Sequence, residues 1–263
     1  MLSFSVLGAL EIRTATGYAE ISGDLQRTLI LTLLIKEGQS VTGETLIDEM
    51  WGDSLPDKES NALQAHVSRL RRRLRQLEPE YPGQRLTIQP SGYRFSLNDA
   101  QLDAIEFIRA VRQAETASAA NPAVAAVLLR EALAMWRGPV FGGFAAGPSC
   151  QVARARYEEH RIRAMELRFD IELRLRMHAA ILPELHEAHR DHPLRERFCE
   201  QLMLALYRAG RQADALGVYR LMRRELDEEL GIEPSPSLQR MEQAVLSHAP
   251  HLDGGLRSLL QPA

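Results

Sequence analysis

The chain has 263 residues, of which 45% are hydrophobic and 25% are charged, and its formal net charge is −3. This composition is that of an ordinary soluble protein that is long enough for two domains with separate cores. Cys150 and Cys199 form no CxxC pair, no secretory signal opens the chain, and no apolar run approaches the roughly 18 residues that span a bilayer. We therefore expect a cytoplasmic protein with no membrane partner.

The first fifty residues predict small antiparallel strands followed by two helices. Hydrophobic and polar residues largely alternate over residues 4–13, and Gly17 separates this run from a short segment at residues 19–21. A first helix is expected from an N-cap at Asp24 to a stop near Gly38, and a second from an N-cap at Thr42 to Trp51 and Gly52. A loop over residues 53–62 is expected to follow.

Residues 61–76, NALQAHVSRLRRRLRQ, have the clearest helical period of the chain. Apolar residues recur at i, i+4, i+7, i+11 and i+14 along one face, which are Leu63, Val67, Leu70, Leu74 and Leu77. The same stretch carries five cations within seven residues, which are Arg69, Arg71, Arg72, Arg73 and Arg75. We predict a helix with one buried face and one face suited to an anion.

An arginine-rich helix is often only a solvated surface, so this alternative stays open on the pattern alone. Two details favour a nucleic-acid surface. The run lacks the interleaved Glu at i±4 that salt-bridged surface helices show. Its outward face also mixes Asn61, Gln64, Ala65, Ser68 and Arg69, and such a mixture suits the edges of bases in a major groove. A DNA-binding chain need not be basic overall, because a local stripe is sufficient.

A β-hairpin is predicted for residues 86–97, LTIQPSGYRFSL, in which alternating apolar residues flank a Pro90-Ser91-Gly92 turn. The order helix, helix, turn, arginine-rich helix, hairpin is that of a winged helix. In such a fold the arginine-rich helix enters the major groove and the hairpin, or wing, lies along the backbone or in the minor groove. Arg94 is then a candidate for the minor groove.

The second half, from residue 102, shows helix periods and almost no strand signal, so we predict an all-α region. Helices are expected from Asp103 to Ala117, Pro122 to Trp136, Ser149 to Arg176, Leu194 to Ala209 and Gln212 to Leu230. The last two, joined by Gly210 and Arg211, partly match a tetratricopeptide repeat, although a plain helical bundle remains an alternative. Gly231 is expected to cap the last of these helices, and Ser237 to begin a further one whose Leu238, Met241, Val245 and Leu246 pack on the bundle.

Five strings carry a resemblance to a known family. Leu46–Gly52, His66–Arg72 and Gly92–Phe95 resemble the winged-helix domain of the OmpR type, and Ala134–Pro139 and residues 208–237 resemble the bacterial transcriptional activator domain. Together, over about residues 4–247, the chain resembles the SARP family, the pathway-specific activators of actinomycete antibiotic clusters. No receiver domain precedes the winged helix, and no GxxxxGK[ST] loop is present, so nucleotide control and cofactors are not expected.

The resemblance implies a mainly α fold in three parts: a winged-helix domain over 1–98, a TPR-like activator domain over 99–250 and a short tail over 251–263. It implies binding to direct repeats near the promoter −35 element, as two copies side by side, and recruitment of RNA polymerase holoenzyme including its sigma factor. The residues assigned to DNA are Trp51, Asn61, Gln64, His66, Ser68, Arg69, Arg71, Arg72, Ser91 and Arg94.

Other functions stay open. A helical-repeat interaction protein could use the basic helix for an acidic protein partner, and the helical half could sense a ligand. An enzyme is not expected, because no GxSxG elbow or kinase signature is present. His186 and His189 stand at i, i+3, but no cysteine pair supports a metal site and surface histidines are commoner than ligands. The arginines of the helical half alternate with glutamates, so that half is not expected to read DNA.

Overall fold

The computed structural model describes residues 2–253, which form two compact units. The first takes in the described residues up to Val111 together with Glu131–Arg161, and the second takes in Arg112–Arg130 and the described residues from Ile162 on. Most of the described chain is helical, as predicted. Of the predicted tail, residues 254–263 lie outside the described residues.

The strands are β1 (Ser3–Ser5), β2 (Glu11–Thr14), β3 (Gly17–Ala19), β4 (Ser40–Val41), β5 (Leu86–Gln89), β6 (Gly92–Phe95) and β7 (Gln101–Leu102). The helices are α1 (Asp24–Ile35), α2 (Gly43–Trp51), α3 (Glu59–Leu77), α4 (Asp103–Ala117), α5 (Pro122–Leu133), α6 (Pro148–Arg174), α7 (His178–Asp191), α8 (Glu196–Arg208), α9 (Gln212–Leu230) and α10 (Pro236–Leu246). Two short 3-10 helices, η1 (Val140–Gly143) and η2 (Pro250–Asp253), complete the described elements.

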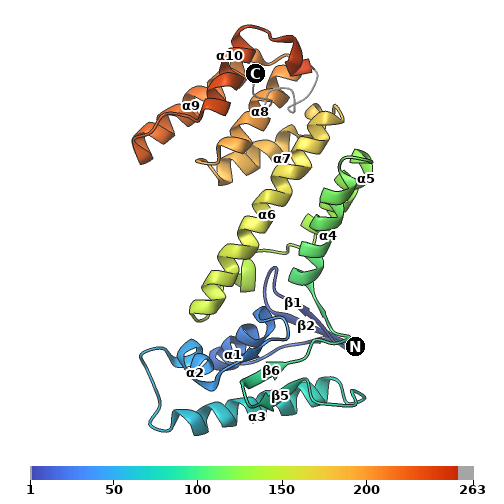
Figure 1. The fold of residues 1–263 in the computed structure, drawn as a ribbon, viewed down its shortest axis with the longest axis vertical. Coiled ribbons are helices and arrows are strands. Elements are labelled where there is room, and N and C mark those ends of the chain that lie inside the picture. The colour runs from blue at the N-terminus through green and yellow to red at the C-terminus, as the bar shows by residue number, and fades with distance from the viewer. Residues whose placement is uncertain (1, 254–263) are drawn as a thin grey trace. The chain divides into compact units, whose positions relative to one another are not determined.

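The first unit contains a winged helix with a leading sheet (Figure 1). The leading sheet has the order β3-β2-β1-β7, with β1 and β2 antiparallel and β7 parallel to β1. The wing sheet has the order β4-β6-β5, in which β5 and β6 are the predicted hairpin. Phe4 of β1 meets Phe95 of β6 edge to face, with ring centroids 5.5 Å apart. This contact joins the two sheets in one core.

The helices of the winged helix form as their capping residues and apolar periods dictate, with two corrections. Thr42 caps α2 as predicted, since its side chain accepts the Thr45 N–H at 3.1 Å. The N-cap of α1 is Gly23 and not Asp24, whose carboxylate lies 3.7 Å from Arg27 instead. The predicted loop over 53–62 is also too long, because α3 begins at Glu59.

Asp103, predicted to cap α4, is the first residue of that helix, and its carboxylate also lies against the leading sheet. Its carboxylate accepts hydrogen bonds from the N–H groups of Val6 and Leu7, at 2.8 to 3.1 Å, and so satisfies backbone donors at the end of β1. Arg137 donates its own N–H to Leu7 and pairs with Glu11 and Asp103 through its guanidinium. The chain that follows the wing is therefore hydrogen bonded to the leading sheet within one compact unit.

The second unit is built around an apolar cluster from α6, α7, α8, α9 and α10. Gln212–Leu230 is the predicted helix, and Gly231 caps it in the left-handed conformation at φ 65°. The next cap was predicted at Ser237, but it is Ser235, because Pro236 occupies the first helical position, where its missing N–H costs nothing. Leu246 was expected to pack on the bundle and is exposed instead. No bounds were predicted for α7, and the helix after Pro122 ends at Leu133 and not at Trp136.

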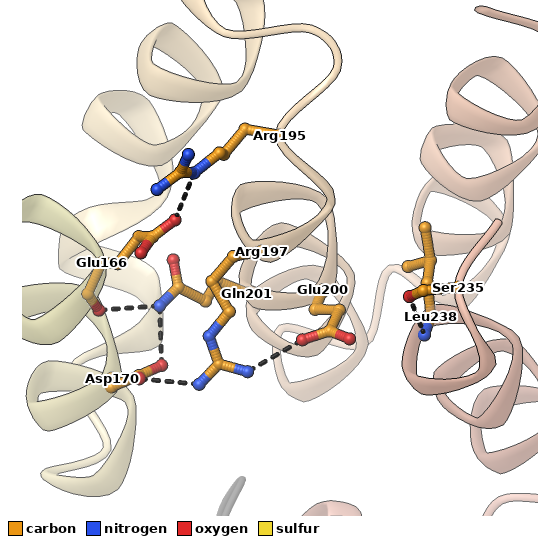
Figure 2. A network of polar contacts seen from close by, with 8 residues as sticks. All are labelled: Glu166, Asp170, Arg195, Arg197, Glu200, Gln201, Ser235 and Leu238. Carbon is orange, nitrogen blue, oxygen red and sulfur yellow. Dashed lines mark hydrogen bonds and ion pairs between the residues drawn. The ribbon is translucent and has the colours of Figure 1, made fainter. Parts of the chain in front are cut away.

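A polar network fastens α8 to α6 inside this unit (Figure 2). Arg197 bridges Asp170 at 2.7 Å and Glu200 at 2.8 Å. Gln201, which is fully buried, donates to the carbonyl of Glu166 at 2.8 Å and to Asp170 at 2.6 Å. Hydrogen bonds and ion pairs between such groups fix the register between two helices better than apolar packing alone.

Candidate DNA interface

The two faces of α3 separate as the sequence predicts. Leu63, Val67, Leu70 and Leu74 are buried against the rest of the winged helix. The opposite face is exposed and consists of Asn61, Gln64, Ala65, Ser68, Arg69, Arg72, Arg73, Arg75 and Gln76. Donors and acceptors for base edges therefore share one solvent face with cations for phosphates.

The arginines of α3 differ in how they are held. Within the described part of the chain, no ion pair engages Arg69, Arg72 or Arg75. Arg71 is half-buried and donates from Nε to the carbonyl of Leu86 in β5 at 2.8 Å, which ties the wing to α3. Arg73 reaches the carbonyl of Glu20 at 3.5 Å. Among the described residues, Arg69 and Arg72 are thus the assigned arginines of α3 that take part in neither an ion pair nor a hydrogen bond to a carbonyl, whereas Arg71 is bonded to the wing.

His66 and Trp51 lie at the junction of α2 and α3. Their rings meet edge to face with centroids 5.7 Å apart, and both residues are half-buried. Gln26 of α1 contacts the His66 ring at Nδ1 over 2.8 Å. Burial first, and then the charge of Arg69, lowers the pKa of His66 below its usual value. The imidazole is therefore neutral at physiological pH.

Ser91 lies in the loop of the wing, and Arg94 lies in its strand β6. Pro90 and Ser91 form a two-residue loop between Gln89 and Gly92, and Ser91 is exposed. Gly92 has φ 124°, and a side chain there would meet the backbone of β4. Arg94 is exposed, pairs with Ser40 in the sheet and donates from Nε to the carbonyl of Gly38 at 2.7 Å.

Sequence reasoning missed two residues of this region. Ile88 was assigned to an alternating apolar strand, yet 61% of it is exposed on the wing. Gln26 was not singled out, although it is 6% exposed and holds His66. The available signal for Gln26 was its position three residues before Leu29 and seven before Leu33, on the apolar face of α1. Such a residue is buried only when it has a partner.

A groove of about 940 Å³ beside α3 has the opposite charge. It is lined by α2 and the start of α3, and its carboxylates include Glu44, Asp48 and Glu59. Such a surface repels phosphates, so its charge contrasts with that of the basic face of α3. Among the described residues, no group of three or more metal-ligating side chains occurs. Of His186 and His189, the second is buried, and its pKa is lowered by burial and by the nearby His186.

The order of parts defines the class of protein: a winged helix of the OmpR type with an exposed basic recognition helix, followed by a helical domain. Family models agree. Residues 102–246 match the bacterial transcriptional activator domain, and residues 23–95 match the domain described as transcriptional regulatory protein, C terminal.

Three similar proteins match most of the chain. Transcriptional regulator RedD of Streptomyces coelicolor is 38% identical over 252 residues, which are 95% of this chain and 72% of RedD. Regulatory protein DnrI of Streptomyces peucetius is 32% identical over 86% of this chain and 85% of DnrI. Regulatory protein AfsR of Streptomyces coelicolor is 39% identical, but the match spans 25% of that longer protein.

A solved structure of Mycobacterium tuberculosis EmbR, in complex with a low affinity phosphopeptide, has the same fold. It superposes with a TM-score of 0.87 at 27% identity and covers 98% of this chain and 69% of EmbR. The chain belongs to the SARP family of transcriptional activators. No helix among the described residues is long and apolar enough to cross a membrane.

Proposed function

We propose that this protein activates a secondary-metabolite biosynthetic gene cluster by binding direct repeats near the promoter −35 element. Two copies bind side by side on the duplex and recruit RNA polymerase holoenzyme through contacts that include its sigma factor. The protein acts in the cytoplasm and has no catalytic activity of its own. The relatives RedD and DnrI, both named as regulators, support the regulatory part of the proposal.

The exposed face of α3 carries the proposal. Asn61, Gln64, Ser68 and Arg69 have the hydrogen-bonding groups that read adenine and guanine edges, and all are exposed. Arg72 lies one turn further along and suits a phosphate. An acidic protein partner suits this face less well. Amide and hydroxyl groups add little to the recognition of carboxylates, whereas they commonly form hydrogen bonds with base edges.

The helical unit suits a supporting role. Two of its arginines are paired with carboxylates in the network of Figure 2, where Arg195 meets Glu166 at 2.9 Å and Arg197 meets Asp170 at 2.7 Å. Cations neutralised in this way do not attract phosphates. Two winged helices set one helical turn of DNA apart, about 10–10.5 bp, lie on the same face of the duplex. We assign the helical half to contacts between neighbouring copies and with polymerase.

Protection mapping of the promoters beside the gene tests the proposal directly. We expect two protected half-sites in direct orientation, with binding that weakens as salt rises. Binding of random and promoter duplexes with equal affinity would remove the sequence-specific function. Tight, salt-sensitive binding to an acidic protein without any duplex binding would favour the interaction module instead.

Arg69→Ala separates base reading from charge. We expect this substitution to weaken binding to the specific site by about 1–3 kcal/mol and to reduce the difference in affinity between that site and random DNA. Arg72→Ala should weaken both duplexes alike and lower the salt slope by about one. Arg163→Ala, an exposed arginine of the helical half, is the matched control and should change neither. An unchanged affinity and discrimination in Arg69→Ala would show that α3 is oriented differently on DNA.

A further inference from the structure

One amide nitrogen of α1 contacts two acceptors of the same residue in α3. Nε2 of Gln26 lies 2.8 Å from Nδ1 of His66 and 3.2 Å from the backbone carbonyl oxygen of His66. Gln26 is 6% exposed, so water does not compete for these contacts. The side chain is a clamp between the helix that forms the core and the helix with the basic face.

The carbonyl contact determines which end of the amide faces His66. A backbone carbonyl oxygen only accepts, so the atom of Gln26 beside it must be the nitrogen and not the oxygen. The same nitrogen then donates to Nδ1, which must lack a proton. The neutral ring therefore carries its proton on Nε2. Protonation of the ring would place two donors against each other over 2.8 Å.

We propose that Gln26 is a positioning residue that holds His66 as a neutral Nε2–H donor to a DNA phosphate. The inference rests on the proposed function and specifies how one residue of that interface works. His66 lies three residues, just under one helical turn, before Arg69 on α3, and Trp51 of α2 packs against its ring. A hydrogen bond from this ring fixes the helix on the backbone without adding a charge.

The surroundings of the ring support a neutral imidazole. Among the described contacts, the charged group that faces it is Arg69 on α3, while Gln26 from α1 and Trp51 from α2 do not titrate. Burial and the neighbouring cation both disfavour the imidazolium, and the pKa of His66 is lowered accordingly. The donor stays in the same state over the physiological range, so binding through it is insensitive to pH.

Nitrogen-15 NMR of the full chain, with the histidine rings labelled, tests the tautomer without DNA. We expect a protonated Nε2 and an unprotonated Nδ1 for His66 at pH 7, because the two states have widely separated shifts. A proton on Nδ1, or an ordinary titration midpoint near 6.5, would overturn the inference whether or not the protein binds DNA.

Gln26→Glu replaces the amide donor beside His66 with a carboxylate acceptor. A carboxylate only accepts, so it draws a proton to Nδ1 and raises the pKa of His66 by pairing with the imidazolium. We expect operator binding of this variant to tighten about fivefold from pH 8 to pH 6, as a charge-assisted bond replaces a neutral one. Wild type and Gln26→Met, which offers no hydrogen bond, should change less than twofold beyond any shared pH trend. Equal pH profiles for wild type and Gln26→Glu would overturn the inference.

His66→Ala gives a readout that does not depend on the fold of the Gln26 variants. Loss of a neutral donor should weaken operator binding about 3- to 10-fold at every pH and leave the salt slope unchanged. Loss of a cation would lower that slope by about 0.9, and this result would contradict a neutral His66. Failure of the wild type to bind any duplex would remove the proposed function, whereas the tautomer would still be decided by NMR.

Discussion

Glu49 is the residue whose removal gives the clearest measure of how the winged helix is joined to the region after it. It lies near the end of α2 with 6% of its surface exposed. Its Oε1 accepts the N–H of Ser149, in the first turn of α6, at 2.7 Å. Both residues belong to the first compact unit. The carboxylate thus satisfies an N–H that the helix itself leaves without a partner.

The expected cost of Glu49→Ala follows from these contacts. A hydrogen bond to a charged group contributes about 1.5–3 kcal/mol, and a negative charge at a helix N-terminus adds about 0.3–1 kcal/mol. The buried Oε2 has no hydrogen-bond partner among the described residues, and its desolvation offsets about 1–3 kcal/mol of that gain. We expect a net loss of about 1–2 kcal/mol, or about 2–8 °C in Tm for a protein of this size.

Urea unfolding of the full chain, followed by circular dichroism, measures this loss. Glu49→Gln keeps an acceptor but not the charge, so it should lose about half as much. Asp48→Ala, an exposed acid one residue earlier on the same helix, is the control and should stay within about 0.5 kcal/mol of wild type. A Glu49→Ala protein as stable as Asp48→Ala would refute the assigned capping role. Gly147→Ala should be worse than either, because its Cβ would lie 2.6 Å from the Glu49 carbonyl oxygen, which cannot move away.

Three further predictions concern the wing and a buried thiol. Arg94→Gln should weaken binding more on sites with A·T-rich flanks than on G·C-rich ones, since a narrow minor groove concentrates negative potential; equal losses in a gel-shift comparison would contradict minor-groove contact. Gly92→Ala should destabilise the wing by roughly 2 kcal/mol or more in urea unfolding, because its Cβ would lie 2.7 Å from the Val41 carbonyl carbon and 2.9 Å from the Thr42 Cα. Burial raises the pKa of the Cys150 thiol to about 12, so iodoacetamide at pH 8 should alkylate it only after unfolding. This folded pKa exceeds the unfolded value of about 8.5. The contribution of the protonated thiol to stability is therefore complete below about pH 8.5 and is lost progressively as pH rises toward 12. Thermal unfolding measured at a series of pH values would detect this loss.

The features that the sequence predicted well are those in which a residue acts on its near neighbours. The buried face of α3 follows from apolar residues spaced one helical turn apart, and the cap at Thr42 follows from a hydroxyl placed before a helical run. Gly231 ends α9 because only glycine adopts the left-handed conformation at little cost. Even the error at Ser237 is local, since it came from placing the cap after Pro236 and not before it.

The exposed face of the candidate site was also within reach of the sequence. A helix with one apolar face must turn its other face to solvent, so the exposure of Asn61, Ser68, Arg69 and Arg72 follows from periodicity. The states of those side chains do not follow. That Arg71 is bonded to the wing, while Arg69 and Arg72 meet no acid among the described residues, depends on strands that are distant in the chain.

The tertiary structure alone decided the contacts between residues far apart in sequence. The Asp103 carboxylate accepts hydrogen bonds from the N–H groups of Val6 and Leu7, Glu49 caps a helix about a hundred residues away, and Gln26 contacts the ring of His66. Such contacts leave no period in the sequence, because any acceptor of suitable length can satisfy a distant donor once the fold brings the two together. The fold class and the basic face of α3 could therefore be predicted from local sequence patterns. The contacts between the winged helix and the following chain, and the contact of Gln26 with the His66 ring, arose only from packing.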